Sequence, residues 1–274
     1  MRTSSILPLV AVATLVACAR KDAAPAGPNV VTIVATDFAF ALPDTLPAGL
    51  TTLRLANAGS EPHHSVLIKL AEGKTLADFQ AAAASPTTPE WMSFPGSPGA
   101  IMPNDTSNAT IVLTPGQYVV ACFVPSPDGT PHIAKGMVKA FVGTGPAPTV
   151  AAAEPQDDIT VTMSDYAFAF STPLTAGSHT LRVENAGPQL HEVSFERLGD
   201  GKTIQDFMAW NQGGQKGPPP SVPAGGMVGP DKGSHAFFSI TLTPGKYLVV
   251  CYVPDEKDQK SHVEHGMIQE ITIN

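Results

Sequence analysis

The chain contains two copies of one sequence pattern, and this repeat limits its possible folds more than any other feature. Residues 36–59 read TDFAFALPDTLPAGLTTLRLANAG and residues 164–187 read SDYAFAFSTPLTAGSHTLRVENAG, at an offset of 128 residues. EGKTLADF at 72–79 and DGKTIQDF at 200–207 keep the same offset. Two copies are too few for a solenoid, in which each repeat is stabilised mainly by its neighbours. We therefore expect two domains of ordinary size, each with a core of its own.

The repeat divides the 274 residues into two domains and their connections. The segment GTGPAPTVAAAEPQD at 143–157 is rich in Pro and Ala and has no periodic apolar face, which is typical of a linker. The predicted organisation is a signal peptide at 1–17, a tether at 18–28, a first domain at 29–143, a linker at 144–156 and a second domain at 157–274.

The N-terminal segment is typical of a protein exported from the bacterial cytoplasm. Arg2 precedes ILPLVAVATLVA, an apolar run of twelve residues that is too short to span a bilayer in the mature protein. The run ends in LVAC at 15–18, which resembles the lipobox of bacterial lipoproteins, whose cysteine carries the lipid. We expect a lipid on Cys18 to anchor the protein at the periplasmic or cell-surface face of a membrane, with no other membrane contact. An ordinary secretory signal with an incidental cysteine is the alternative.

Within each copy, short β-branched and alternating runs predict strands. LTTLRLAN and HTLRVEN alternate apolar and polar residues with the period of two that is expected of a strand. ATIVLTPGQYVVACFV at 109–124 holds two strands around a Thr-Pro-Gly turn, and Tyr118 after this turn resembles the tyrosine corner of Greek-key sandwiches. TLAD at 75–78 and TIQD at 203–206 predict the start of one short helix per copy. The predicted class is all-β, with two tandem Greek-key β-sandwiches that each carry one short helix and a long Gly/Pro loop.

Composition excludes some partners. The chain has 16 Lys and Arg against 24 Asp and Glu, so its formal net charge is −8. Because nucleic-acid binding needs clustered basic side chains, we expect no nucleic-acid partner. With 43% hydrophobic and 15% charged residues, the chain is expected to be globular.

Cysteine, histidine and methionine follow one another in the same order in both copies. Residues 122–137 read CFVPSPDGTPHIAKGM, and residues 251–267 read CYVPDEKDQKSHVEHGM. Strand alternation makes Cys122 and Cys251 the last inward-facing residues before each strand opens into a loop. A buried apolar cysteine or a disulfide is the simpler interpretation of the pair. Neither explains why a histidine and a methionine follow each cysteine.

One further histidine per copy stands just after a turn, at the start of a strand. Residues 57–66 read NAGSEPHHSV, and residues 185–193 read NAGPQLHEV. The offset equates His63 with His191, and we choose His63 for that reason. Strand alternation would instead point His64 inward, so the sequence leaves His63 and His64 as alternatives.

Two histidines, one cysteine and one weakly bound methionine form the donor set of blue-copper sites. Each copy resembles a cupredoxin, such as plastocyanin or azurin, over its whole length. The resemblance rests on the N-x-G…H segment, the PG-x-Y…C strand and the C…H-x4-(G)M loop. It implies one copper per domain. The implied ligands are His63, Cys122, His132 and Met137 in the first domain, and His191, Cys251, His262 and Met267 in the second.

The loop between cysteine and the second histidine departs from the small blue-copper proteins, where only a few residues separate them. Here nine residues lie between Cys122 and His132, and ten between Cys251 and His262. Nine extended residues span roughly 30 Å, so reach is not limiting. The first loop contains three prolines and the second contains one, so we expect the second loop to be less ordered.

These features predict an exported electron-transfer protein with one type 1-like copper per domain and a redox partner that the sequence leaves unidentified. We expect it not to be an enzyme, because copper oxidases and nitrite reductases use His-x-His pairs and a histidine beside the cysteine, and neither occurs here. A protein that stores, delivers or senses copper is one alternative, suited by exposed methionines at 92, 102, 208 and 227. A metal-free interaction module is the other.

Overall fold

The computed structural model of the chain describes residues 27–83, 85, 87–147 and 153–274. The predicted signal peptide at 1–17 and the predicted lipid site at Cys18 lie outside the described residues. Among the helices of the described residues, none is both long and apolar enough to cross a membrane.

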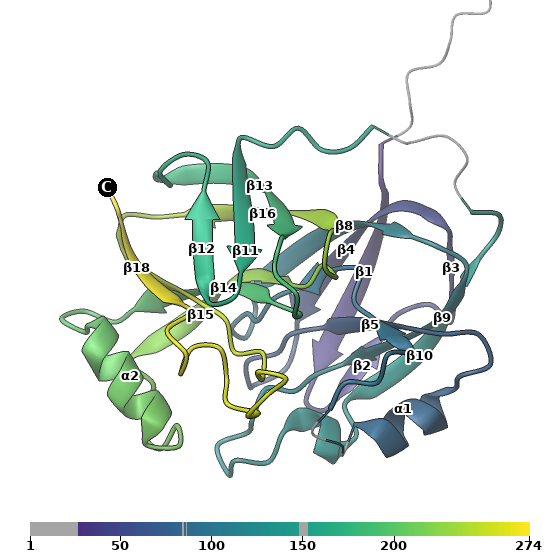
Figure 1. Ribbon diagram of the computed structural model, residues 1–274, viewed down its shortest axis with the longest axis horizontal. Coiled ribbons are helices and arrows are strands. Elements are labelled where there is room, and N and C mark those ends of the chain that lie inside the picture. Colours follow the sequence, from purple (N-terminus) through teal and green to yellow (C-terminus); the bar gives the residue numbers. More distant parts are fainter. Residues whose placement is uncertain (1–26, 84, 86, 148–152) are drawn as a thin grey trace, which may run out of the picture.

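Each half of the chain forms a sandwich of two β-sheets (Figure 1). The elements of the first half are β1 (Asn29–Thr36), β2 (Ala39–Ala41), β3 (Thr45–Pro47), β4 (Gly49–Asn57), β5 (Val66–Leu70), α1 (Leu76–Ala82), β6 (Met92–Ser93), β7 (Ser97–Pro98), β8 (Thr106–Leu113), β9 (Gly116–Ala121), the 3-10 helix η1 (His132–Lys135) and β10 (Val138–Thr144). One sheet has the order β2-β1-β4-β8 and the other β3-β10-β9-β5-β6.

The second half repeats this arrangement. Its elements are β11 (Ile159–Ser164), β12 (Ala167–Phe170), β13 (Gly177–Asn185), β14 (Glu192–Leu198), α2 (Ile204–Gln212), β15 (Ser221–Val228), β16 (His235–Leu242), β17 (Gly245–Val250) and β18 (Ile268–Ile273). The sheet orders are β12-β11-β13-β16 and β18-β17-β14-β15. In both halves the first strand pairs parallel with a long strand further along the chain, β1 with β4 and β11 with β13. The predicted all-β class with two sandwiches is confirmed.

The strand that leads to each cysteine is buried on both faces. Tyr118 and Val120 of β9 lie with Cys122 in the apolar core between the sheets. Val119 and Ala121 face outward, where they pack in the cluster that includes the buried Phe79 of α1. The second domain divides β17 in the same way, with Tyr247, Val249 and Cys251 inside and Leu248 and Val250 toward α2. This double burial explains why YVVAC and YLVVC are apolar throughout, as expected for a central strand.

The predicted local signals form the predicted structures. Thr75 caps α1 and Thr203 caps α2, each in a reciprocal capping box with the aspartate three residues on. The hydroxyl of Tyr118 donates to the Thr114 carbonyl over 2.9 Å, and the hydroxyl of Tyr247 donates to the Thr243 carbonyl over 3.2 Å. Both tyrosine corners therefore fasten the turn that precedes a cysteine-bearing strand.

The two sandwiches are joined edge to edge. Strand β8 pairs with β16, which makes one sheet of eight strands, and β7 from the loop after α1 extends the second-domain sheet beside β15. The side-chain amide of Asn108 strengthens the first junction by donating to and accepting from the backbone of Ser239, both over 2.9 Å. In Figure 1, α1 and α2 lie on opposite outer sides of this joined body.

Whether residues 29–143 and 157–274 each fold alone stays a prediction, which separate expression and thermal melting would check.

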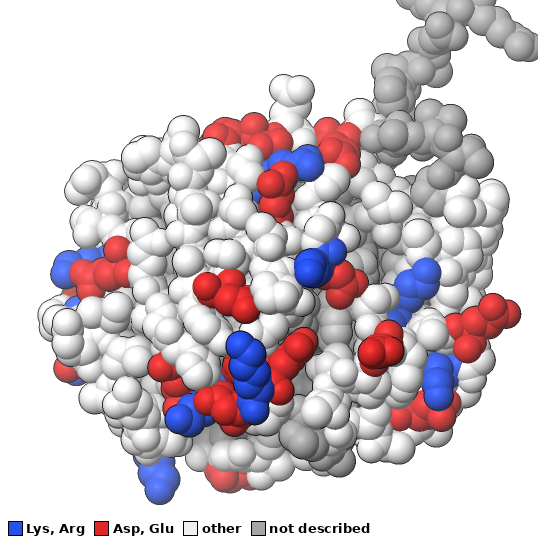
Figure 2. Space-filling view, viewed as in Figure 1, with Lys and Arg blue, Asp and Glu red and all other residues white. Residues whose placement is uncertain are grey.

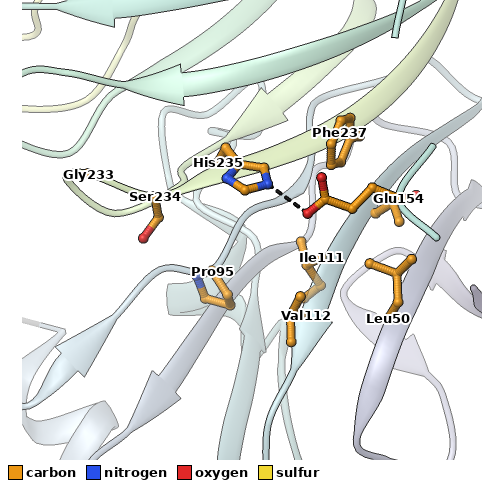
Figure 3. A pocket seen from close by; sticks show the side chains of 10 residues that line it. Leu50, Pro95, Ile111, Val112, Glu154, Gly233, Ser234, His235 and Phe237 are labelled. Atoms are coloured by element: carbon orange, nitrogen blue, oxygen red, sulfur yellow. Dashed lines mark hydrogen bonds and ion pairs between the residues drawn. The ribbon is translucent and has the colours of Figure 1, made fainter. Parts of the chain in front are cut away.

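A hollow of about 340 Å³ lies at the domain boundary (Figure 3). Leu50, Ile111 and Val112 of the first domain line it, together with Phe237 and His235 of the second. Glu154, next to the predicted linker's end, accepts from His235 over 2.8 Å and contacts Arg182 over 3.4 Å. This ion-pair group holds the connecting segment against the second domain.

Charges of both signs are mixed on the face that Figure 2 shows. Among the described residues of that face, basic side chains stand singly among acidic ones and form no continuous basic surface. Among the described residues, lysines also pair with acids, Lys139 with Asp44 and Lys246 with Glu270.

Candidate metal centres

The first domain brings His63, Cys122 and His132 together in its core. The Nδ1 atoms of the two histidines are 3.0 Å apart, and the Cys122 Sγ lies 3.9 Å from Nδ1 of His63 and 3.4 Å from Nδ1 of His132. All three side chains are buried, with 0% of each residue exposed. Three donor atoms thus converge on one point that the solvent does not reach.

The backbone explains why these residues meet. Cys122 directly follows β9, and its amide donates to the carbonyl of Met137 over 3.2 Å. The amide of Met137 in turn donates to the carbonyl of His132 over 3.0 Å. Gly136 closes η1 in the left-handed region at φ 97°, which turns the chain back toward the site. Cysteine, histidine and methionine are therefore held by one hydrogen-bonded loop.

The second domain forms the same group from His191, Cys251 and His262. The Nδ1 atoms of the histidines are 3.1 Å apart, and Cys251 Sγ lies 3.3 Å from Nδ1 of His262. Cys251 again donates to the carbonyl of Met267 over 3.2 Å, and Met267 to that of His262 over 2.9 Å. In each domain the three donor atoms lie within 4.8 Å of one another. Met137 and Met267 are fully buried.

The structure distinguishes the adjacent histidines His63 and His64. His63 belongs to the donor group, whereas the Nε2 of His64 accepts from the backbone amide of Phe123 over 2.7 Å. Burial lowers the pKa of His64 to about 3, which keeps it neutral and able to accept. Glu192 occupies the same position in the second domain and accepts from the amide of Tyr252 over 2.7 Å. The residue after the first histidine therefore fastens the backbone after the cysteine.

Four carboxylates that the sequence analysis did not single out surround the donor groups. Asp37 accepts from Nε2 of His63 over 2.9 Å, and Asp165 does so for His191 at the same distance. Glu61 accepts from Nε2 of His132 over 2.8 Å. Asp255 lies near Nε2 of His262, at 3.9 Å. The matching aspartates of TDFAF and SDYAF were visible in the repeat, but their contact with the histidines was not.

The protonation of the donors fits a soft cation. Burial raises the pKa of the Cys122 thiol to about 12 and also raises that of Cys251, so both are neutral thiols near pH 7 unless a cation replaces the proton. Burial lowers the pKa of His63 and His191, against the opposing effect of their aspartates, and lowers that of His262 to about 4. Neutral imidazole and thiolate with a neighbouring thioether form the donor set that suits copper in both oxidation states. Each domain therefore holds one type 1-like copper site.

The second Cys–His loop is ordered by polar contacts in place of prolines. Asp255, with 1% of the residue exposed, accepts from the amide of Lys257 and from Gln189, over 2.8 and 2.9 Å. His265 contacts Asp258 at 3.1 Å and stacks on Tyr166. Asp255, Asp258 and His265 also form a third group of possible metal donors, which lies partly in solvent.

A backbone ladder connects the two copper sites across the domain boundary. His63 and Ile101 exchange two hydrogen bonds, of 3.1 and 3.0 Å. Beside Ile101, the carbonyl of Ala100 accepts from Gly225 of β15 over 3.1 Å. Directly after β15, Gly229 donates to the carbonyl of His191 over 3.0 Å. The first histidines of both sites are thus connected by a path of backbone segments and the hydrogen bonds between them.

The expectation that Met92, Met102, Met208 and Met227 are exposed is wrong, because Met102 is half-buried like Met92 and Met208, and Met227 is fully buried. Met227 pairs with Pro98 at the domain boundary. Met92 and Met208 pack against apolar clusters beside α1 and α2. Met92, Met208 and Met227 fill apolar gaps, because a flexible thioether adapts to irregular packing.

Burial raises the carboxyl pKa of Glu196 to about 7, next to Tyr252 and Ser221, which donate to it over 3.2 and 3.1 Å. Because its pKa is higher in the folded state than in the unfolded chain, folding is favoured below the unfolded pKa and loses this contribution as the pH rises toward 7. Glu196→Gln should therefore raise the free energy of unfolding by up to about 3 kcal/mol at pH 8 and leave it nearly unchanged at pH 4.5.

The measurement is denaturant unfolding of the metal-free protein between pH 4.5 and 8. Glu256→Gln, an exposed position in the same domain, is the control and should leave the pH profile as in the wild type. An equal gain at both ends of the pH range would contradict the assigned cause.

Comparison with known proteins gives a likeness in fold. No family model matches the chain, and no curated protein matches it. Among solved structures, a reduced auracyanin of Roseiflexus castenholzii matches with 16% identity and a TM-score of 0.32, over 44% of this chain and 100% of its own. Auracyanin A of Chloroflexus aurantiacus, a blue copper protein, matches with 21% identity and a TM-score of 0.31, over 43% and 100%. A multicopper oxidase matches with 15% identity and a TM-score of 0.26, over 89% of this chain and 88% of its own.

At such low identities and TM-scores, these likenesses carry no argument about function. The assignment of a cupredoxin-like sandwich with a type 1-like site rests on sheet order, donor grouping and burial in this chain.

Proposed function

We propose that this protein is an electron carrier with one copper in each domain. The observation that carries the proposal is the burial of two equivalent His-Cys-His groups, each tied by backbone hydrogen bonds to a buried methionine. Electron transfer is fast when a metal changes oxidation state without large movements of its ligands. A donor group on two rigid sheets and one hydrogen-bonded loop meets this requirement.

The residues of the chain have separate tasks in this proposal. Copper, when bound, supplies the one-electron chemistry. Cys122 and Cys251 would hold it as thiolates, the four histidines as neutral nitrogen donors, and Met137 and Met267 as weak thioether donors. The closed core excludes water from the donor atoms, and the carboxylates at Nε2 fix the orientation of the histidine rings.

The test is copper loading of the full chain followed by copper quantitation and visible spectroscopy. We expect two coppers per chain, an intense thiolate-to-copper band in the oxidised protein, and loss of this band on reduction by one electron per copper. Zinc serves as the control, since it binds the same donors but is colourless and redox-silent. Full copper loading without the band would overturn the proposal and favour storage or delivery of copper.

The alternatives are less well supported. Copper storage or delivery would use accessible thioethers, and Met227 is buried at the domain boundary. An oxidase would need a further copper centre rich in histidine, and the third donor group among the described residues contains a single histidine. A metal-free interaction module leaves unexplained why two buried thiols each face two imidazoles.

We also propose that the protein is exported and anchored by a lipid on Cys18. The support is the apolar run that ends in LVAC at residues 15–18. In a bacterial host, mass spectrometry of the mature N-terminus should find a lipidated Cys18, and Cys18→Ser should release the protein from membranes. An unmodified N-terminus at another residue would exclude the lipid anchor.

A further inference from the structure

The first histidine of each site has a carboxylate at its outer nitrogen, and the geometry is duplicated. Asp37 and Asp165 each lie 2.9 Å from Nε2 of their histidine. Such a contact holds the proton on Nε2 and leaves Nδ1, which faces the cysteine, free to donate its lone pair. Two copies that have diverged elsewhere keep this contact at the same distance.

A glycine makes room for this contact in each domain. A Cβ atom at Gly59 would lie 2.7 Å from Nε2 of His63, and one at Gly187 would lie 2.5 Å from Nε2 of His191. Any side chain at either position would therefore push the histidine from its aspartate. This explains the physical requirement for glycine in the repeated motif NAG at 57–59 and 185–187.

The second histidine also has a carboxylate, but the two domains supply it from different elements. In the first domain Glu61, in the turn before β5, accepts from His132 over 2.8 Å. The matching residue in the second domain is Gln189, which carries no charge. There the acid is Asp255, four residues after Cys251, at the position that Ser126 occupies after Cys122. The loss of one carboxylate is thus accompanied by the gain of another.

The surroundings of Asp255 have changed with it. Its Oδ2 atom accepts from Tyr166 and from Gln189 and lies 3.9 Å from Nε2 of His262. That Nε2 is fully buried and has no hydrogen-bond partner among the described residues. In the first domain, Phe38 stands in the place of Tyr166, with its ring 5.0 Å from that of His132 and no hydroxyl to offer. Three positions have therefore changed together between the domains: Phe38 to Tyr166, Glu61 to Gln189 and Ser126 to Asp255.

We propose that Glu61 in the first domain and Asp255 in the second are the positioning residues of the second copper-binding histidine, reached by an exchange of the acid between two loops. The proposal rests on the copper sites of the proposed function. Its consequence is that the two sites are unequal, because Glu61 bonds directly to His132 whereas Asp255 is shared and stands farther from His262. The first site is the more rigid of the two and binds copper(II) more tightly.

The test transfers the acid within the first domain. Copper(II) affinity is measured by competition titration on the full chain carrying Cys251→Ser, so that only the first site contributes to the measurement. Glu61→Gln should weaken copper(II) binding about 10- to 100-fold and shift the visible band, as is typical when an outer partner of a ligand is lost. Adding Ser126→Asp and Phe38→Tyr to Glu61→Gln reproduces the set of the second domain and should restore part of the lost affinity, to a level below that of the parent.

The controls separate positioning from general damage. Glu72→Gln, the same change at an exposed site, should leave affinity and band unchanged. Thermal melting of the metal-free proteins should show that Glu61→Gln folds as the parent does. Unchanged affinity and band in Glu61→Gln would overturn the inference, even where the transferred set does not fold.

The outcome also distinguishes this inference from the proposed function. If the parent protein shows the thiolate-to-copper band and Glu61→Gln changes neither the copper affinity nor the band, only the inference is rejected. A parent that binds copper without the band would reject electron transfer, and the affinity comparison would still decide the role of Glu61.

Discussion

Replacing either core cysteine should remove one copper and half of the visible band. Cys122→Ser is expected to abolish the band of the first site and leave that of the second, and Cys251→Ser should do the reverse. The reason is that a serine hydroxyl does not ionise near neutral pH and supplies no soft donor, so the charge-transfer transition has no origin. Quantitation of copper and the visible absorption of each oxidised variant measure the effect.

The third cysteine offers the matched control. Cys18→Ser makes the same atomic change at a cysteine that the predicted ligand sets do not include, and it should keep two coppers and the full band. The two core variants should keep their folded structure in the metal-free form, because serine is smaller than cysteine and its hydroxyl can hydrogen-bond to the neighbouring histidine nitrogen. A band that survives in both core variants would refute thiolate coordination.

A single methyl group at Gly226 should disrupt the boundary between the domains. Gly226 lies in β15 at φ 130°, and a Cβ atom there would run into the carbonyl oxygen of Val193 and lie 3.0 Å from the Cα atom of Ser194. On its other side, the Gly226 carbonyl accepts from Gly99 of the first domain over 2.9 Å. Gly226→Ala therefore forces β15 away from β14 or from the first domain. This shift also disrupts the backbone connection between the copper sites.

The size of this effect is set by comparison with Gly177→Ala. Gly177 has a similar φ of 123°, but a Cβ atom there meets no atom within 4 Å. In both variants the alanine must adopt an unfavourable φ angle, but only Gly226→Ala also creates an atomic overlap. Gly226→Ala should therefore lower the free energy of unfolding by about 2–3 kcal/mol more than Gly177→Ala does. Denaturant unfolding gives the comparison. Equal losses in the two variants would show that β15 moves freely at this point.

Local signals in the sequence predicted the two helices and the turns before the cysteine-bearing strands. The capping residues Thr75 and Thr203 start α1 and α2, and Tyr118 and Tyr247 form their corners. These features involve residues at most four positions apart, so their spacing along the chain is enough to define the contact. The inward direction of each cysteine follows in the same way from the alternation of a strand.

Such local signals do not predict contacts between segments that are distant in the sequence. Strand alternation favoured His64 over His63, yet His63 sits in an isolated bridge with Ile101 rather than in β5, so the alternation of that strand does not reach it. The partners of the histidines lie 26 residues away at Asp37 and 71 at Glu61. Met227 was expected to be exposed, but β15 lies between β14 and β7, and Met227 packs in the main apolar core.

The sequence by itself determined the duplication, the strand class, the order of cysteine, histidine and methionine, and the chemistry of their side chains. Each of these depends on residue identity and on short intervals along the chain. The tertiary structure alone decided which histidine joins the cysteine, which carboxylate stands behind each ring, and how the two sandwiches join into one sheet. These depend on the register between strands that meet only after folding, where a shift by one residue would turn every side chain to the opposite face.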